Sequence, residues 1–235
     1  MGIAFAYGNS ELDFDDRSGD GSADSYMGAI YAGWSDSRFR AGLSGRIAYS
    51  EMETDRTITV GTLVRGAKSD FDGLDIGTRL EAGGKWIASE EFVLESYGSL
   101  DYAHLQRSSI RETGADSVNL RIDEEKLDSL RVSLGTRIRT IVEIDRDVWM
   151  LPEIRGEWHH QLLDRDRAID ASFAGATVGP GFKIRGAELQ RDSASIGVGW
   201  KVRSRDGFEI GIDYDLGIDP DRLAHAIALR IETAW

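Results

Sequence analysis

A two-residue alternation of apolar and polar side chains constrains the fold of this chain more than any other feature. Between 208 and 217, every even position is apolar and every odd one is Glu, Gly or Asp. Between 223 and 231, the odd positions are apolar except His225. Successive residues of a β-strand point to opposite faces, so this period predicts strands with one apolar face. No comparable stretch follows the 3.6-residue spacing of a helix, and we therefore expect an all-β chain.

The alternation divides the chain into about ten segments that are long for strands. They lie near 2–14, 23–34, 38–51, 70–87, 91–106, 126–142, 148–163, 186–203, 207–217 and 223–235. Most exceed the five or six residues usual in globular sheets. A strand tilted by about 45° needs roughly 9–11 residues to cross a bilayer, and these segments are long enough.

The connections between these segments alternate in length. Short links occupy 35–37, 88–90, 145–147 and 204–206, and long polar links occupy about 15–22, 52–69, 107–125 and 164–185. The last link, 218–220, breaks the rule. Short turns at one end and long loops at the other are typical of a transmembrane antiparallel up-and-down β-barrel, with the short turns in the periplasm.

Aromatic residues gather at the two ends of the predicted strands, as expected of amphipathic rings at the two membrane interfaces. The predicted membrane belt comprises Trp34, Trp86, Trp200, Tyr214 and Trp235. Trp149 is out of phase with Met150 and Ile154, which predicts a bulge or a different face at that position. A soluble barrel or sandwich would explain the alternation, but neither the belts nor the unequal loops.

The polar face carries charges of both signs, as a barrel lumen does. The predicted lumen-lining residues are Arg40, Arg46, Arg79, Glu81, Arg131, Arg137, Arg139, Glu153, Arg155 and Glu157. Two interpretations stay open. A basic wall would hold a passing segment or set ion selectivity, whereas cross-strand pairing with carboxylates would make the charges structural.

Composition excludes several functional classes. The 235 residues carry a net charge of -13, which argues against binding nucleic acid, and they contain no cysteine, which removes disulfides and thiolate chemistry. No run of about 18 apolar residues predicts a transmembrane helix. No secretory leader precedes the first strand-like segment, so we expect that any export signal is removed or lies upstream.

No motif predicts a catalytic residue, a metal site or a cofactor. His159 and His160 are adjacent, so in a strand they point to opposite faces and do not easily share an ion. The stretch DFDDRSGDGSAD matches a calcium loop in part but has Met27 at the position of the bidentate Glu. The stretch GATVGPGFKIRG lacks the lysine and serine of a phosphate loop and predicts a flexible loop. A Ser/His/Asp site assembled across strands remains open, but we expect no enzyme.

Several segments together resemble the autotransporter β-domain, the translocator of type V secretion. SYMGAIYAGW followed by RFRAGLSGRIAYSEM is similar to its early strands, and LRVSLGTRI, MLPEIRGEWHHQLLD, IDASFAG and ASIGVGWKV resemble its later ones. FVLESYGSLDYAHL resembles another strand, although Ser96 stands where that family often has proline. The final strand, with apolar residues at alternate positions before a terminal Trp235, resembles the outer-membrane assembly signal.

This resemblance implies a protein of the outer membrane of a Gram-negative bacterium that exports a covalently linked passenger domain. The implied partners are the lipid bilayer, lipopolysaccharide and, through the C-terminal strand, the outer-membrane barrel assembly machinery. Family barrels have twelve strands and a pore helix, so we expect residues 1–235 to be a C-terminal fragment that lacks two strands and the helix. The alternative is a small outer-membrane channel or adhesin that acts through acidic extracellular loops.

Overall fold

The computed structural model describes residues 1–14, 19–89, 92–163, 168–175, 181–185, 190–220 and 222–233. Ten long strands form the main sheet: β1 (Gly2–Phe14), β2 (Gly19–Ser35), β3 (Phe39–Val60), β4 (Leu63–Ser89), β5 (Phe92–Arg107), β8 (Glu125–Thr140), β10 (Val148–Gln161), β13 (Asp192–Ser204), β14 (Phe208–Asp219) and β15 (Arg222–Thr233). The smaller elements are β6 (Ile110–Arg111), the 3-10 helix η1 (Asp116–Val118), β7 (Leu120–Ile122), β9 (Val142–Asp145), β11 (Ala168–Phe173) and β12 (Phe182–Arg185). The predicted all-β fold is confirmed.

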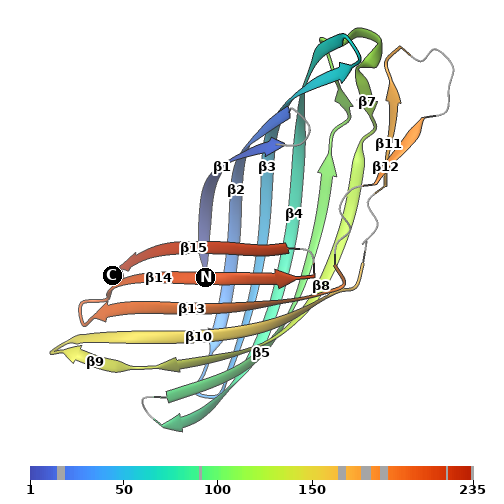
Figure 1. The fold of residues 1–235 in the computed structure, drawn as a ribbon. Helices are drawn as coiled ribbons and strands as arrows, with labels where there is room; N and C mark the ends of the chain where they lie inside the picture. The colour runs from blue at the N-terminus through green and yellow to red at the C-terminus, as the bar shows by residue number, and fades with distance from the viewer. Residues whose placement is uncertain are drawn as a thin grey trace.

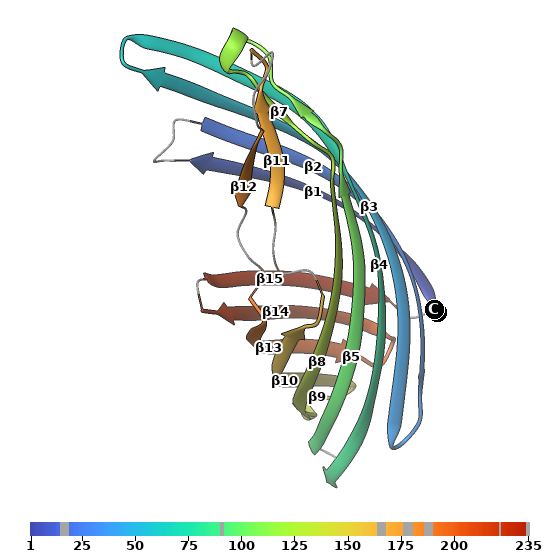
Figure 2. The same ribbon diagram turned by 90° about the vertical axis from the view of Figure 1, so that its right-hand side faces the viewer.

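Each long strand pairs antiparallel with the long strands that precede and follow it in the chain, which is the predicted up-and-down order. The sheet curls strongly, so that β13, β14 and β15 run across the direction of β1 to β4 (Figures 1 and 2). Consecutive pairing keeps the connections short and lets each alternation continue across the sheet. The predicted number of long strands and their approximate positions are confirmed.

The described sheet is an open trough with β1 and β15 at its two edges. Every residue of β15 is exposed, and no pairing joins β15 to β1 within the described residues. An unpaired strand edge leaves N–H and C=O groups without partners, which is costly in hydrocarbon. The two edges therefore need further partners in a membrane.

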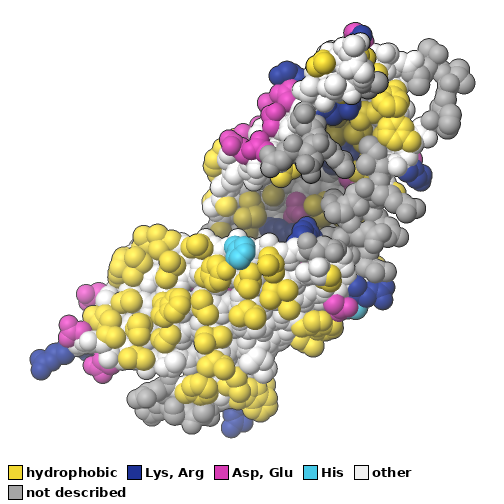
Figure 3. All heavy atoms as spheres, in the orientation of Figure 1, with side chains coloured by type: hydrophobic (Ala, Val, Ile, Leu, Met, Phe, Trp, Pro, Cys, Tyr) yellow, Lys and Arg dark blue, Asp and Glu magenta, His cyan; other side chains and the backbone are white. Residues whose placement is uncertain are grey.

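The convex face is apolar and exposed, and the concave face is polar. Figure 3 shows the apolar side chains gathered over β13 to β15, with charged side chains visible in the hollow behind them. Exposed residues of the convex face include Phe5, Ile30, Leu43, Leu80, Ile154, Ile212 and Leu229. Buried polar residues of the concave face include Glu95, Ser133, Glu209 and Asp213. This arrangement is the inverse of a soluble barrel, and it suits lipid outside and water inside.

The prediction of a long loop at 52–69 is wrong. β3 and β4 continue through it to Val60 and Leu63, and they are joined by a tight turn in which Gly61 has φ 62°. Beyond the apolar band this hairpin carries polar residues on both faces, so the regular alternation disappears although the backbone stays extended. Similarly, β2 begins at Gly19, inside the link predicted at 15–22.

Two of the predicted long loops fold together into a second, four-stranded sheet in the order β12-β11-β7-β6. Arg56 of β3 anchors it through a bidentate ion pair with Glu112, at 2.7 and 2.6 Å. The hydrogen bond that it donates to this carboxylate raises the pKa of the Arg56 guanidinium. Lys68 and Thr113 add a backbone bridge with two hydrogen bonds of 2.9 Å. The second sheet is thereby connected to the tip of β3 and β4.

The predicted irregularity at Trp149 is present. The pairing of β9 with β10 shifts register between Val148 and Trp149, and Trp149 then pairs with Arg203, whose face is the concave one. Within the described residues, no helix is long and apolar enough to cross a bilayer.

We predict that Leu229→Arg lowers the free energy of unfolding in lipid vesicles by about 2–4 kcal/mol, because its side chain faces lipid. The matched control is Ala228→Arg on the same strand, which faces inward and pairs in register with Asp213. Chemical denaturation of both variants measures the difference. Equal losses at the two positions would contradict the assignment of the faces.

Candidate functional site

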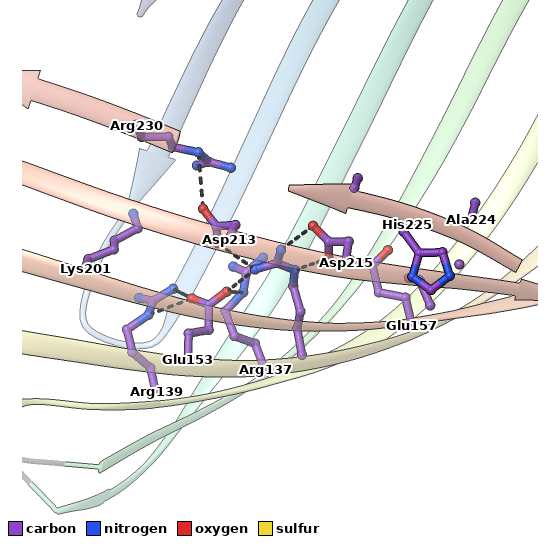
Figure 4. Close-up of a pocket in the computed structure, with 14 residues that line it drawn as sticks. Arg137, Arg139, Glu153, Glu157, Lys201, Asp213, Asp215, Ala224, His225 and Arg230 are labelled. Carbon is purple, nitrogen blue, oxygen red and sulfur yellow. Dashed lines mark hydrogen bonds and ion pairs between the residues drawn. The ribbon is translucent and has the colours of Figure 1, made fainter. Parts of the chain in front are cut away.

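The charged part of the concave face surrounds a cavity of about 540 Å³ formed by β8, β10, β13, β14 and β15 (Figure 4). Cations and carboxylates from these neighbouring strands line it. They are Arg137, Arg139, Glu153, Arg155, Glu157, Lys201, Asp213, Asp215 and Arg230. Each belongs to the inward set of its strand, so the two-residue period places them all on one wall.

Arg155 is the centre of this wall. Its guanidinium donates to Asp215 at 3.0 and 2.6 Å, to Asp213 at 3.1 Å and to Glu153 at 3.1 Å. Gly197 makes room for the group, because a Cβ there would lie 2.5 Å from Arg155 Nε and 2.3 Å from Asp215 Oδ1. A planar guanidinium with several donors suits this junction of three carboxylates better than a lysine would.

Glu153 extends the network towards β8. Its carboxylate forms ion pairs with Arg137 at 3.1 Å and Arg139 at 3.0 Å, in addition to Arg155. Two strands further, Glu95 is almost fully buried and forms ion pairs with Arg40 and Arg137. Buried carboxylates at these positions are stable only because several guanidiniums surround them.

A third group of charges lies on β3 to β5. Glu81 binds both Arg40 and Arg79, the second at 2.8 Å, and Arg79 also contacts Asp101 at 3.1 Å. Arg46 is more exposed and pairs with Asp75 at 2.9 Å. The ion pairs thus run across strands from β3 to β14.

Tyr97 joins the two halves of the wall. Its ring lies between the guanidiniums of Arg40 and Arg137, with distances of 5.1 and 4.9 Å from the ring centroid. Its hydroxyl donates to Glu157 at 2.5 Å. Gly135 leaves the space for the ring, because a Cβ there would lie 2.6 Å from Tyr97 Cζ. Cation–π contacts and the hydroxyl hydrogen bond hold this ring in one position.

The structure brings together most of the residues predicted to line the lumen. Arg40, Arg79, Glu81, Arg137, Arg139, Glu153 and Arg155 belong to the connected network, Arg46 pairs beside it, and Glu157 binds Tyr97 rather than an arginine. Arg131 lies on the same face but is exposed, with no ion pair within the described residues. Sequence reasoning did not single out Tyr97, Lys201, Asp213, Asp215 or Arg230, although their inward parity was available as a signal. The function of these residues remains a prediction.

The predicted belt residues Trp34, Trp86, Trp200 and Tyr214 lie on the apolar face, with Trp86 65% exposed. Trp235 lies outside the described residues. Tyr214 shares a hydrogen bond of 2.8 Å with His225 on β15.

The two adjacent histidines point to opposite faces, as expected. His159 faces inward between Ser133 at 2.8 Å and Ser195 at 3.2 Å, whereas His160 contacts Asp192 at 2.9 Å and stacks on Trp158. No group of metal-binding side chains occurs among the described residues.

The two loop motifs lie partly outside those residues. DFDDRSGDGSAD includes 15–18, and GATVGPGFKIRG includes 176–180 and 186. Of the first motif, Asp24 is described, and its carboxylate accepts hydrogen bonds from Tyr7 and Asn9. Of the second, Phe182–Arg185 forms β12 rather than a flexible loop.

We predict that Arg155→Leu lowers the free energy of unfolding by about 3–5 kcal/mol, because three carboxylates lose their shared cation. Arg46→Leu, which removes a more exposed cation with one partner, should cost about 1 kcal/mol or less. Denaturation in lipid vesicles measures both. A loss at Arg155 no greater than that at Arg46 would show that the network is not cooperative.

Comparison with known proteins identifies the family. The model of the autotransporter beta-domain matches residues 1–215. The outer membrane protein A of Rickettsia conorii is 23% identical over 200 residues, which cover 85% of this chain and 9% of that protein. The chain thus spans about a tenth of the length of this curated relative.

A solved structure supports the fold. The translocator domain of the autotransporter NalP from Neisseria meningitidis matches with a TM-score of 0.66 and 12% identity, over 97% of this chain and 73% of that one. The inferred resemblance is confirmed. The chain belongs to the autotransporter β-domain family of transport domains, which places it in the outer membrane of a Gram-negative bacterium.

Proposed function

We propose that this sheet is the translocator of an autotransporter and that a covalently linked passenger reaches the cell surface through its polar interior. The observation that carries the proposal is the separation of the two faces, with ion pairs from β3 to β14 on the concave face and exposed apolar side chains on the convex face. A polypeptide crossing a membrane needs such a wetted path, because hydrocarbon offers its backbone no hydrogen-bond partners.

Because the charges are paired with one another, they support passage of a polypeptide rather than its tight binding. Arg155 and Glu153 satisfy one another and their neighbours, so the wall is hydrophilic without a strong net field. Both edge strands add small inward residues, including Ala4 and Ala6 on β1 and Ala226 and Ala228 on β15. A wall of this kind has low affinity for any one sequence, which suits transport of a long and varied chain.

We also propose that residues 1–235 are the C-terminal part of a longer protein. The unpaired edges of β1 and β15 support this, because additional strands between them would satisfy their backbone groups and close the barrel. We extend the proposal to the assembly partners. The alternating residues of β15 fit a strand that engages the barrel assembly machinery, and the extracellular half of the apolar face fits lipopolysaccharide.

A second candidate is a surface adhesin or a small channel. The extracellular sheet of β6, β7, β11 and β12 favours an adhesin, because it gives the loops an ordered surface of their own. No residue is assigned a catalytic role in either case.

The test uses the full-length protein with an epitope inserted before residue 1 of this chain. A translocator brings the epitope to the surface, where added protease removes it from intact cells. The matched control lacks β14 and β15, which prevents assembly and should keep the epitope inside the cell.

Surface exposure that depends on β14 and β15 would support translocation. An intact barrel, verified by its heat-dependent mobility in electrophoresis, whose epitope always stays in the periplasm would overturn the proposal and favour the adhesin or channel.

A further inference from the structure

The convex face of the main sheet carries the same arrangement of three side chains twice. Each set consists of an aromatic residue, a histidine two positions later in the same strand, and an aspartate directly opposite that histidine on the next strand of the sheet. The two sets, called the outer triads below, are Tyr102–His104–Asp128 on β5 and β8 and Trp158–His160–Asp192 on β10 and β13. All six side chains have the lipid-facing parity of their strands, and the two aromatic rings are 42% and 44% exposed.

In both outer triads the histidine binds its aspartate in the same way. Nδ1 of the ring lies 3.0 Å from Asp128 Oδ1 in the first triad and 2.9 Å from Asp192 Oδ1 in the second. The aromatic residue then fixes the pair. The Tyr102 hydroxyl donates to Asp128 at 2.6 Å, whereas the Trp158 ring stacks on the imidazole of its own triad with 5.5 Å between centroids. Both imidazoles are thereby held in a defined orientation on the convex face.

The second ring nitrogen of each histidine makes the outer triads rich in hydrogen-bond acceptors. A carboxylate only accepts, so Nδ1 carries the hydrogen, and Nε2 of the neutral ring is an acceptor. Within the described residues, Nε2 of His104 and of His160 has no partner, and Asp192 has no side-chain partner besides His160. Each triad therefore combines acceptors with an exposed aromatic ring, which fits a ligand that has both hydrogen-bond donors and an apolar surface.

Both outer triads lie at the same height, at the outer boundary of the apolar band. Tyr102 is ten residues beyond Phe92, where β5 begins, and Trp158 is ten residues beyond Val148, where β10 begins. Both strands begin at short turns, which face the periplasm in the expected orientation. Ten residues of a strand tilted by about 45° rise roughly 23 Å, close to the roughly 25 Å height of the apolar band of such barrels. The triads therefore meet the head groups of the outer leaflet.

We propose that the two outer triads bind the acylated amino-sugar head group of lipopolysaccharide. Hydroxyl and amide N–H groups of the sugar donate to Nε2 of the histidine and to the aspartate, and the carbon face of the sugar ring packs on Tyr102 or Trp158. The aspartates repel phosphate, so recognition depends on the donors of the sugar rather than on its charge. The inference deepens the lipopolysaccharide contact in the proposed function and rests on the membrane orientation used there, but not on passenger export.

The test is native mass spectrometry of the purified full-length protein, titrated with lipid A, the acylated amino-sugar part of lipopolysaccharide, or with phosphatidylcholine, whose head group has no donor. We expect the first lipid A to bind about tenfold more tightly than phosphatidylcholine, because its donors pair with the triads. His104→Phe combined with His160→Phe keeps the rings and removes the acceptors, and it should abolish this preference. Asp128→Asn combined with Asp192→Asn, which keeps the side-chain shape, should weaken the preference.

The matched control is His225→Phe, because this third histidine of the lipid-facing side binds Tyr214 and forms no ion pair with a carboxylate within the described residues. It should keep the preference, and an equal loss there would overturn the proposal, since any histidine at the interface would then suffice. Binding of lipid A that EDTA removes would indicate a bridging divalent cation and would also overturn it.

No preference in the wild-type protein, or a preference that persists without His104 and His160, would overturn the proposal whether or not the passenger is exported. Heat-dependent mobility in electrophoresis verifies that each variant is folded. The aspartate variant tests the triads if the histidine variant is not folded.

Discussion

The absence of hydrogen-bond partners inside a bilayer is the constraint on which the rest of this structure depends. Backbone groups satisfy it by pairing strand to strand, from β1 through β15. Side chains satisfy it by facing lipid when apolar and facing inward when polar. Once charges are confined to one concave wall, they must be paired at close range, because an isolated buried charge is far more costly than a paired one. The network around Arg155, Glu153 and Glu95 follows from that confinement.

Outside the membrane, water supplies hydrogen-bond partners, so the strands no longer need one apolar face. The hairpin of β3 and β4 extends far beyond the apolar band with polar residues on both faces, since water satisfies them there. Short segments of the long loops then add to one another as β6, β7, β11 and β12, which are held to the hairpin by Arg56 and Glu112. The long strands and the short ones thus form two sheets that meet different surroundings.

The sequence predicts the membrane part well because the bilayer imposes a strict period. The faces of Ile212, Leu229, Arg79 and Glu81 follow from parity alone, whereas their cross-strand neighbours depend on the register. The extension of β3 and β4 was missed because polar residues on both faces carry no period, and the second sheet was missed because strands of two to six residues have too few alternations to detect. Tyr97 was missed because its position depends on the space left by Gly135, and no local pattern reports such a contact.

The most direct test of the central claim uses the absence of cysteine from residues 1–235, since each introduced cysteine is then the single one in this sheet. Single cysteines placed along β15 from 223 to 229 in the full-length protein can be exposed, in intact outer membranes, to a water-soluble maleimide small enough to enter the lumen. Labelling should alternate, with Ala224→Cys, Ala226→Cys and Ala228→Cys reacting and Leu223→Cys, Ile227→Cys and Leu229→Cys protected by lipid. Equal labelling of both sets, or protection of the inward set, would contradict a water-filled lumen enclosed by a lipid-facing sheet.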